Sequence, residues 1–115
     1  MVQDCIFCKI ASGAIATNKV YEDDDVMAFE DISPQAPVHI LIITKQHVEN
    51  VDAVLDEHQE LLGKLLLTAR DIAREKKISE SGYRLILNTN PDSGQEVYHI
   101  HMHLLGGRKF MWPPG

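Results

Sequence analysis

Residues 99–105 read His-Ile-His-Met-His-Leu-Leu, so histidines alternate with apolar residues along this segment. Successive side chains of a β-strand point to opposite faces of its sheet, which gives a strand a period of two residues. The alternation therefore predicts a strand, placed at Val97–Leu105, with its three histidines on one face. Ile100, Met102 and Leu104 share the other face, so the rest of the chain must supply a core to cover them.

One long helix and further strands are expected around this segment. Apolar residues between Leu61 and Ala73 recur at i, i+3 and i+4 spacing, which indicates a helix with one buried face. We expect this helix to begin with Asp56 as its N-cap and Gln59 at the N3 position, and to stop before Ser81-Gly82. The other expected elements are a short helix at Asp4–Ser12 and strands at Lys19–Glu22, Asp25–Glu30, His39–Thr44 and Tyr83–Asn88. This order is typical of an α+β fold with an antiparallel sheet of about five strands.

The size and charge of the chain exclude several classes of function. Its 115 residues bound a single domain, 1–115. The formal net charge of −6 disfavours non-specific binding to nucleic acid or to anionic lipid, because both are polyanions. No apolar run is longer than Ile40–Ile43, which is far too short to span a membrane. We therefore expect a small molecule or another protein as partner, with no nucleic acid and no membrane.

The first residues of the chain indicate the cellular compartment in which the protein is expected. Ala14-Ile15-Ala16 has the form of a signal cleavage site, but the stretch before it carries Asp4 and Lys9 and lacks a clean apolar segment. We expect no signal peptide and a cytoplasmic protein. Its two cysteines, Cys5 and Cys8, are then expected as reduced thiols or metal ligands, because disulfides are rare in that compartment.

Three histidines on one face of a strand admit more than one interpretation. They could be the polar face of an ordinary amphipathic strand, but imidazoles ionise near neutral pH, which suits acid–base chemistry or metal binding. Residues at i and i+2 lie about 7 Å apart along a strand, a poor spacing for one zinc ion bound by all three. We favour a nucleophilic imidazole whose neighbours handle protons and phosphate charge.

The preceding loop, Ser93-Gly94-Gln95-Glu96, favours phosphate chemistry. Gly94 lets the backbone approach a ligand closely, although it is equally interpreted as a plain turn glycine. Backbone N–H groups and neutral donors such as Gln95 and Asn88 can hold a phosphate without a cationic side chain.

Several segments together carry a family resemblance. They are residues 99–105, Asp31-Ile32-Ser33-Pro34-Gln35-Ala36-Pro37, Gly94-Gln95-Glu96-Val97-Tyr98-His99 and Trp112-Pro113-Pro114-Gly115. They resemble the nucleotide-binding branch of the histidine-triad (HIT) superfamily. The resemblance implies a single HIT domain and hydrolysis of purine nucleoside phosphoramidates to a nucleoside monophosphate and an amine. It also implies a covalent nucleotidyl-histidine intermediate and no metal in the chemistry.

Two other functions compete with this hypothesis. One is a dinucleoside polyphosphate hydrolase of the same superfamily. The other is a purine-nucleotide-binding or scaffold module in which hydrolysis is vestigial.

A homodimer is expected on two grounds. The resemblance implies a sheet that continues across a dimer interface. In addition, the helix at Leu61–Ala73 and the strand at Tyr83–Asn88 offer more apolar surface than a chain of this size readily buries alone, and a free sheet edge invites pairing.

The resemblance also implies roles for individual residues. His101 matches the nucleophile, His103 the partner that contacts the phosphate or the leaving group, and His39 an additional active-site histidine. We expect the second ring nitrogen of His101 to bond a backbone carbonyl, which would fix its tautomer. Asp31 matches a carboxylate that binds both ribose hydroxyls; without the resemblance it would be interpreted as a turn cap. The implied base pocket consists of Phe7, Ile10, Phe29 and Ile32, and the implied phosphate contacts are Asn88, Gln95 and the backbone from Gly94 to Val97.

Cys5-Ile6-Phe7-Cys8 is a C-x-x-C pair, which alone could be a redox pair or two buried thiols. Some members of the superfamily bind zinc with such cysteines, a histidine after the central strand and the first histidine of the triad. The matching residues here are His47 and His99. A Cys2His2 set is a closed structural site with no open position for catalysis. The alternative is a pair of reduced thiols without a ligand.

Overall fold

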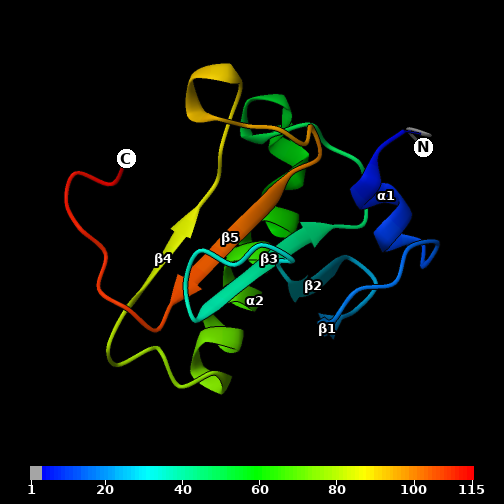
Figure 1. Ribbon diagram of the computed structural model, residues 1–115. Helices are drawn as coiled ribbons and strands as arrows, with labels where there is room; N and C mark the ends of the chain where they lie inside the picture. Colours follow the sequence, from blue (N-terminus) through cyan, green and yellow to red (C-terminus); the bar gives the residue numbers. More distant parts are fainter. Residues whose placement is uncertain (1–3) are drawn as a thin grey trace.

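Five antiparallel strands form one sheet in the order β1-β2-β3-β5-β4 (Figure 1). The computed structural model describes residues 4–115, so the first three residues of the expected domain lie outside the described part. The strands are β1 (Lys19–Glu22), β2 (Val26–Glu30), β3 (Val38–Thr44), β4 (Tyr83–Ile86) and β5 (His101–Gly106). Helix α2 (Gln59–Glu75) covers one face of the sheet, and helix α1 (Ile6–Ala11) packs against the other. The predicted α+β fold is confirmed.

Strand β3 lies at the centre of the sheet and is buried on both faces. Ile40 and Ile42 point into the core beneath α2, whereas Leu41 and Ile43 point into a second cluster beneath α1. This explains the unbroken apolar run at Ile40–Ile43, because a strand covered on both sides needs no polar alternation. The two clusters give the sheet one fully covered face and one face that is covered only in part.

Strand β5 begins at His101, four residues after the predicted start at Val97. The backbone N–H of Ile100 donates to the carbonyl of Val48 at 2.6 Å, outside the regular ladder with β3. The prediction that all three histidines share one strand face is therefore wrong for His99. His101 and His103 lie on the strand, while His99 precedes it and is fully buried.

The ends of α2 also differ from the prediction. A 3-10 turn at Asp56–His58 precedes the helix, and Nδ1 of His58 accepts a hydrogen bond from the backbone N–H of Leu55 at 2.9 Å. The group that caps this turn is thus His58, and the prediction of Asp56 as N-cap is wrong. At the other end the helix stops at Glu75, because Lys77 adopts a left-handed conformation with φ of 60°.

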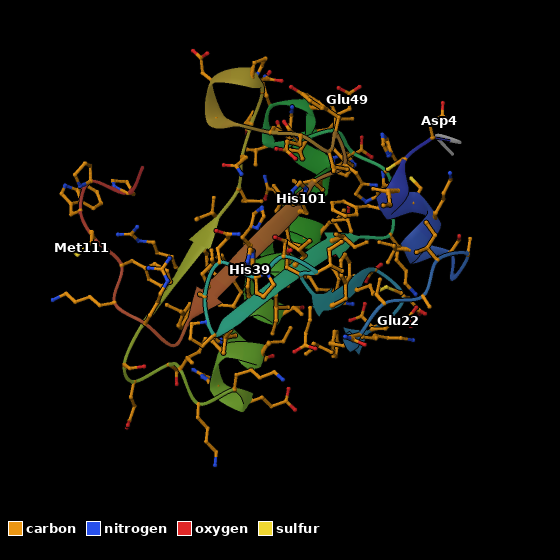
Figure 2. The ribbon with its side chains drawn as sticks, viewed as in Figure 1. Asp4, Glu22, His39, Glu49, His101 and Met111 are labelled. Carbon is orange, nitrogen blue, oxygen red and sulfur yellow. The ribbon has the colours of Figure 1, made fainter. Side chains whose placement is uncertain are left out.

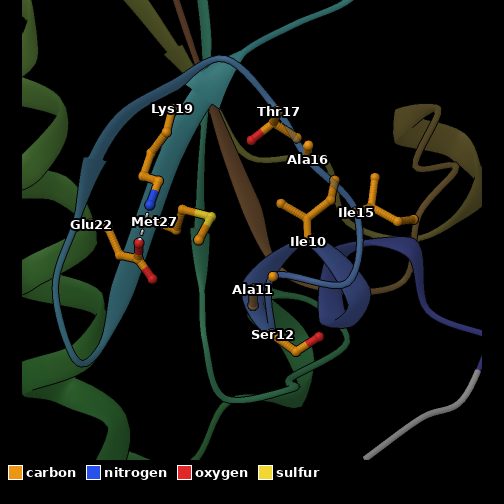
Figure 3. A pocket seen from close by; sticks show the side chains of 10 residues that line it. Ile10, Ala11, Ser12, Ile15, Ala16, Thr17, Lys19, Glu22 and Met27 are labelled. Atoms are coloured by element: carbon orange, nitrogen blue, oxygen red, sulfur yellow. Dashed lines mark hydrogen bonds and ion pairs between the residues drawn. The ribbon is translucent and has the colours of Figure 1, made fainter.

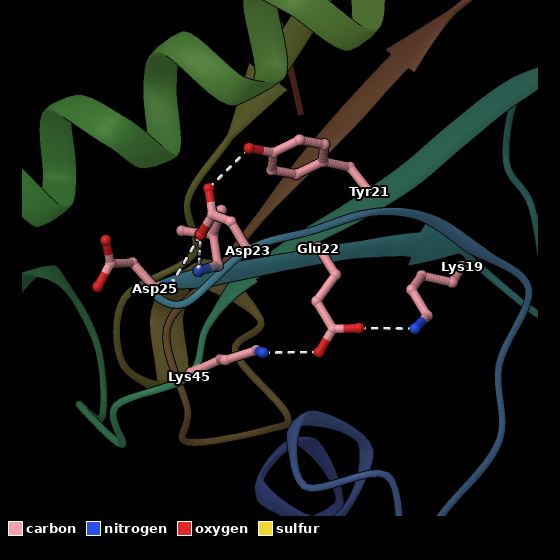
Figure 4. Close-up of polar contacts among 7 residues, drawn as sticks. Lys19, Tyr21, Glu22, Asp23, Asp25 and Lys45 are labelled. Atoms are coloured by element: carbon pink, nitrogen blue, oxygen red, sulfur yellow. Dashed lines mark hydrogen bonds and ion pairs between the residues drawn. The ribbon is translucent and has the colours of Figure 1, made fainter.

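The predicted strands β1 and β2 form a hairpin around an acidic turn (Figure 4). The carboxylate of Asp23 accepts hydrogen bonds from the backbone N–H of Asp25 and of the following residue, at 2.8 and 3.0 Å. Glu22 pairs with Lys19 and Lys45, each at 2.6 Å. A short polar side chain that bonds the next backbone groups is what such a turn needs.

The remaining boundaries shift slightly. Strand β4 ends at Ile86, which pairs with His103, so Asn88, the predicted end of this strand, lies outside it. None of the helices in the described part of the chain has the length and apolar character that a membrane crossing requires.

Candidate active site and metal centre

Three histidines meet on the face of the sheet opposite α2. In the ladder between β3 and β5, His39 pairs with Leu105, and His103 pairs with Leu41. His39 and His103 are therefore diagonal neighbours, and their nearest ring nitrogens, Nε2 of His39 and Nδ1 of His103, lie 2.9 Å apart. The rings of His101 and His103 have centroids 5.1 Å apart. Figure 2 shows His39 and His101 projecting from this side of the sheet, with α2 behind it.

His101 is oriented by a backbone group. Its Nδ1 lies 2.7 Å from the carbonyl oxygen of His99. Because a carbonyl oxygen only accepts, Nδ1 must carry the proton, and in the neutral ring Nε2 then has a free lone pair. The expectation that the second nitrogen of His101 bonds a backbone carbonyl is confirmed.

A second chain of hydrogen bonds fixes the tautomers of His39 and His103. The backbone N–H of Gln35 donates to Nδ1 of His39 at 3.0 Å, so neutral His39 carries its proton on Nε2. That proton points to Nδ1 of His103, which therefore accepts. Neutral His103 must then carry its own proton on Nε2, which makes it a hydrogen-bond donor.

The two remaining Nε2 atoms are open. Neither Nε2 of His101 nor Nε2 of His103 has a hydrogen-bond partner among residues 4–115. Every fully buried side-chain nitrogen and oxygen in that part of the chain does have a partner. These two atoms are thus accessible from outside, one as a lone pair and the other as an N–H donor.

Burial keeps these histidines neutral. It lowers the pKa of His39 and of His101 below the ordinary value of 6.5, and for each the carboxylate of Asp31 opposes the shift. The pKa of His103 falls to about 4, because burial and the charges of His101 and His39 all disfavour its protonated form. At pH 7 a nucleophilic imidazole at this site needs no prior deprotonation.

Asp31 lies next to this chain. Its Oδ1 accepts a hydrogen bond from the backbone N–H of Ser33 at 2.8 Å, and its Oδ2 lies 3.5 Å from Nε2 of His39. The carboxylate of Asp31 thus caps the turn, as its sequence context alone predicted, and it also faces the histidines. Asp31, His39 and His103 are close enough together to suggest a metal site. However, Nε2 of His39 carries a proton here, and a protonated nitrogen cannot be a ligand.

Most of the expected base pocket gathers in one apolar cluster. Phe7, Ile10 and Phe29 are buried in the cluster beneath α1, and the rings of Phe7 and Phe29 are 5.9 Å apart. The ring of Phe7 also lies 4.9 Å from that of His101, edge to face. Ile32, the fourth residue of the expected pocket, is fully exposed and lies outside this cluster.

A hollow of about 320 Å³ opens beside this cluster (Figure 3). Ile10 and Met27 of the cluster line it, and the ion pair between Lys19 and Glu22 lies at its edge. Phe7, Phe29 and the three histidines do not line this hollow, so it borders the cluster on the side away from the histidines.

The loop between β4 and β5 holds the expected phosphate contacts. Gly94 has a φ of 86°, which favours glycine. The side chain of Asn88 is half-buried and forms no hydrogen bond among residues 4–115. Gln95, in contrast, turns its side chain inward, where both ends of the amide are bonded to the protein. The side chain of Gln95 is therefore not free to bind a phosphate, whereas its backbone N–H is free to do so.

Four potential metal ligands meet where α1 reaches the sheet. The Sγ of Cys5 lies 3.3 Å from Nδ1 of His99, and the Sγ of Cys8 lies 3.3 Å from Nδ1 of His47. The two Nδ1 atoms are 3.2 Å apart, and all four ligand atoms lie within 4.8 Å of one another. A tetrahedral zinc ion with ordinary bond lengths would separate its ligand atoms by roughly 3.4–3.7 Å. The cluster is therefore of the right size and donor type to hold such an ion.

The ring of His99 is oriented for ligation. Its Nε2 donates to the carbonyl oxygen of Thr44 at 2.6 Å, so Nδ1 presents its lone pair to the two sulfur atoms. A second hydrogen bond of this kind, which fixes tautomer and ring orientation, is typical of histidines that bind metals.

Backbone groups explain what the sequence did not show. The N–H of Gln35 and the carbonyl of Thr44 orient catalytic and ligand candidates, yet a backbone group is present at every residue and leaves no sequence signal. Asn50, which bonds the loop of Gln95, was also missed because it belongs to no motif.

Comparisons with known proteins agree with this arrangement. The HIT domain family model matches residues 12–110. A purine nucleoside phosphoramidase of Escherichia coli K12 is 55% identical over 108 residues, which are 94% of this chain and 91% of the relative. An uncharacterised HIT-like protein of Synechococcus elongatus is 54% identical over 115 residues, the full length of both chains.

Solved structures show the same fold. A HIT family hydrolase from Legionella pneumophila is 53% identical with a TM-score of 0.96, over 97% of this chain and 100% of the other. A histidine triad protein from Clostridium difficile is 43% identical with a TM-score of 0.93, over 96% of each chain.

The depressed pKa of His103 predicts a dependence of stability on pH. In the unfolded chain this ring takes up a proton near pH 6.5, but in the folded protein only near pH 4. Between these values the unfolded state binds more protons than the folded state. The contribution of His103 to the free energy of unfolding is therefore complete above pH 6.5 and is lost as the pH falls towards 4.

Urea denaturation at a series of pH values, with the wild type and His103→Gln, measures this effect. The free energy of unfolding should fall less steeply with acidification in the variant. A ring of His103 that titrates at 6.5 or above by NMR would contradict the assignment.

Proposed function

Since the chain belongs to the HIT domain family, we propose that it is a purine nucleoside phosphoramidase that releases a nucleoside monophosphate and an amine. The observation that carries the proposal is the orientation of His101, whose Nδ1 is bonded to the carbonyl of His99 while Nε2 is open. The 55% identity to a protein named purine nucleoside phosphoramidase supports the choice of substrate.

The substrate would lie across the face formed by β3, β5 and α1. The base would contact Phe7 and Phe29 and the exposed side chain of Ile32. The ribose hydroxyls would bond to Asp31, whose carboxylate is only partly buried. The phosphate would then rest between Nε2 of His101 and the loop that follows Gly94.

The reaction would proceed in two displacements. In the first, Nε2 of His101 attacks the phosphorus, the P–N bond breaks, and the amine leaves with a proton taken up from solvent water. The ring becomes a cationic adduct, whose Nδ1–H still donates to the carbonyl of His99. In the second, water attacks the phosphorus, and its released proton balances the one that the amine took up. His101 leaves as a neutral imidazole.

His103 would act as a hydrogen-bond donor. Its pKa of about 4 keeps it neutral in the free protein, and its Nδ1 accepts from His39. The Nε2–H can therefore donate to a phosphate oxygen or to the leaving nitrogen. His39 is a positioning residue in this scheme, because it acts on His103 by fixing the tautomer.

We further propose a structural zinc ion held by Cys5, Cys8, His47 and His99. Four protein ligands leave no open coordination position, so the ion would cross-link α1 to the sheet without entering the chemistry. The cysteines are buried and form no disulfide with each other, which suits ligation.

A homodimer is proposed for the assembly. Strand β4 is a free edge of the sheet, which offers unpaired backbone groups to a second copy. Leu66 and Leu67 are each about half exposed on α2, and Trp112 near the C-terminus is 82% exposed. In a dimer, this tail could contact the partner's site and shape its preference among leaving groups.

Two other functions can be separated from this one by direct assay. A dinucleoside polyphosphate hydrolase would cleave diadenosine polyphosphates faster than adenosine phosphoramidate, and a binding module would cleave neither. Side-by-side turnover of both substrates distinguishes the three. The open Nε2 of His101 favours an active enzyme over a vestigial one.

Replacement of the nucleophile gives the sharpest test. We expect His101→Ala to lose at least roughly 10³-fold in turnover while AMP binding persists, because the base and ribose contacts remain. We expect His103→Ala to lose less, about 10²-fold, because a good leaving group can bypass a donor. An isotopically chiral substrate should show retention at phosphorus; inversion, or normal turnover in His101→Ala, would exclude the covalent route.

Metal analysis tests the zinc proposal. Protein purified without chelator should contain near-stoichiometric zinc per chain. The double variant Cys5→Ser/Cys8→Ser should lose the metal and should lower the melting temperature more than the turnover. Full metal retention in that variant would remove the assignment.

Sedimentation tests the assembly. At micromolar concentration the protein should sediment as a dimer, and Trp112→Ala should alter the relative KM values of substrates with different amines. A monomer under these conditions would contradict the proposal.

A further inference from the structure

Two buried amides join the loop between β4 and β5 to a distant segment. Gln95 lies in that loop, and Asn50 follows β3 and precedes α2. Their side chains are only 8% and 4% exposed. The reaction scheme above uses neither side chain, yet buried polar groups of this kind hold a defined conformation when all their bonds are made.

The amide of Gln95 is fully bonded. Its Oε1 accepts from the backbone N–H of Asn90 at 2.8 Å and from Nδ2 of Asn50 at 3.1 Å. Its Nε2 donates to the carbonyls of Glu49 and Val97, at 2.9 and 3.1 Å. An amide side chain has two donors and two acceptor positions, so this one is used completely inside the protein.

Asn50 completes the link. Its Oδ1 accepts from the backbone N–H of Ala53 at 3.1 Å, which settles the orientation of its amide. Its Nδ2 then donates both to Gln95 and to Oδ1 of Asn90, the latter at 3.0 Å. Asn90 has a φ of 67° and a ψ of 179°, a strained conformation for a residue other than glycine. Such a conformation persists only where surrounding bonds hold it.

The segment that follows Gly94 carries free donors. Among residues 4–115, the backbone N–H groups of residues 95–99 have no hydrogen-bond acceptor. A run of free N–H groups in a turn forms a concavity that binds anions. Val97 packs against the cluster that contains Phe7, whose ring lies 4.9 Å from that of His101. The last residue of the segment, His99, also contacts His101 directly, because its carbonyl oxygen accepts the Nδ1–H of His101 at 2.7 Å. The segment with the free donors therefore leads directly to His101.

We propose that Asn50 and Gln95 form a clamp that holds these backbone N–H groups in place for the phosphate of the substrate. Asn50 is then a positioning residue, which acts through Gln95 and Asn90 and does not touch the nucleotide. The inference rests on the proposed function, since the phosphate in question is that of a bound nucleotide.

The test compares a ligand that has a phosphate with one that lacks it. Calorimetry gives the affinities of AMP and of adenosine for the wild type, Asn50→Ser and Gln95→Met. Serine keeps an acceptor for the N–H of Ala53 but cannot reach Asn90 and Gln95, and methionine keeps the volume of glutamine without its polar atoms. Both changes are neutral, so no new charge acts on the phosphate.

Both variants should bind AMP about tenfold more weakly, the loss expected for one or two hydrogen bonds to a charged group. Adenosine should bind as it does to the wild type, which also shows that the variants are folded. The double variant should lose no more than Gln95→Met alone, because the two side chains act as one unit. Asp92→Glu is the matched control in the same loop, since it keeps the charge and that side chain is exposed and forms no hydrogen bond among residues 4–115.

The outcomes separate the two proposals. If the wild type cleaves a phosphoramidate but both variants keep the wild-type ratio of AMP to adenosine affinity, the clamp is wrong and the proposed function stands. Equal losses for AMP and adenosine would also overturn the clamp, because they would indicate a general structural defect. If the wild type binds neither ligand, both proposals fail.

Discussion

The fully buried ring of His99 connects three parts of the molecule that are far apart in the sequence. Its Nε2 donates to the carbonyl of Thr44 at the end of β3, and its Nδ1 faces Cys5, Cys8 and His47. Its own carbonyl accepts the Nδ1–H of His101. A buried histidine costs free energy unless its polar atoms are bonded, and here each bond also positions another part of the site. The metal centre candidate and the nucleophile candidate thus share one residue.

Few charged groups lie near the three histidines of the candidate active site. Within residues 4–115, Asp31 is the only carboxylate that acts on the charges of the three imidazoles of the candidate site, and no lysine or arginine is among the groups that do so. Binding of an anionic phosphate would then depend on oriented N–H groups rather than on a cationic side chain. Burial lowers the pKa of His101 and so favours its neutral form, in which Nε2, the proposed attacking atom, has a lone pair.

The sequence predicted the fold well because its strongest signals are periodic. The helical repeat between Leu61 and Ala73 and the apolar run at Ile40–Ile43 correspond to α2 and β3. It placed His39 and His103 in the site but put His99 on the strand, since alternation alone does not show where a regular ladder begins. It also assigned the side chain of Gln95 to a ligand, because an amide next to a glycine looks the same whether it faces outward or inward. Contacts through backbone groups, such as the N–H of Gln35, had no signal at all.

Main-chain atoms orient three of the histidines in the two candidate sites. The groups that orient His39, His99 and His101 are the N–H of Gln35 and the carbonyls of Thr44 and His99. Because these are main-chain atoms, side chains at positions 35 and 44 can drift without disturbing the imidazoles, provided that the path of the chain is kept. A designer who transplants only the histidines to another scaffold would lose their orientation. The unit that has to be transplanted is the antiparallel pair of β3 and β5 together with its flanking turns.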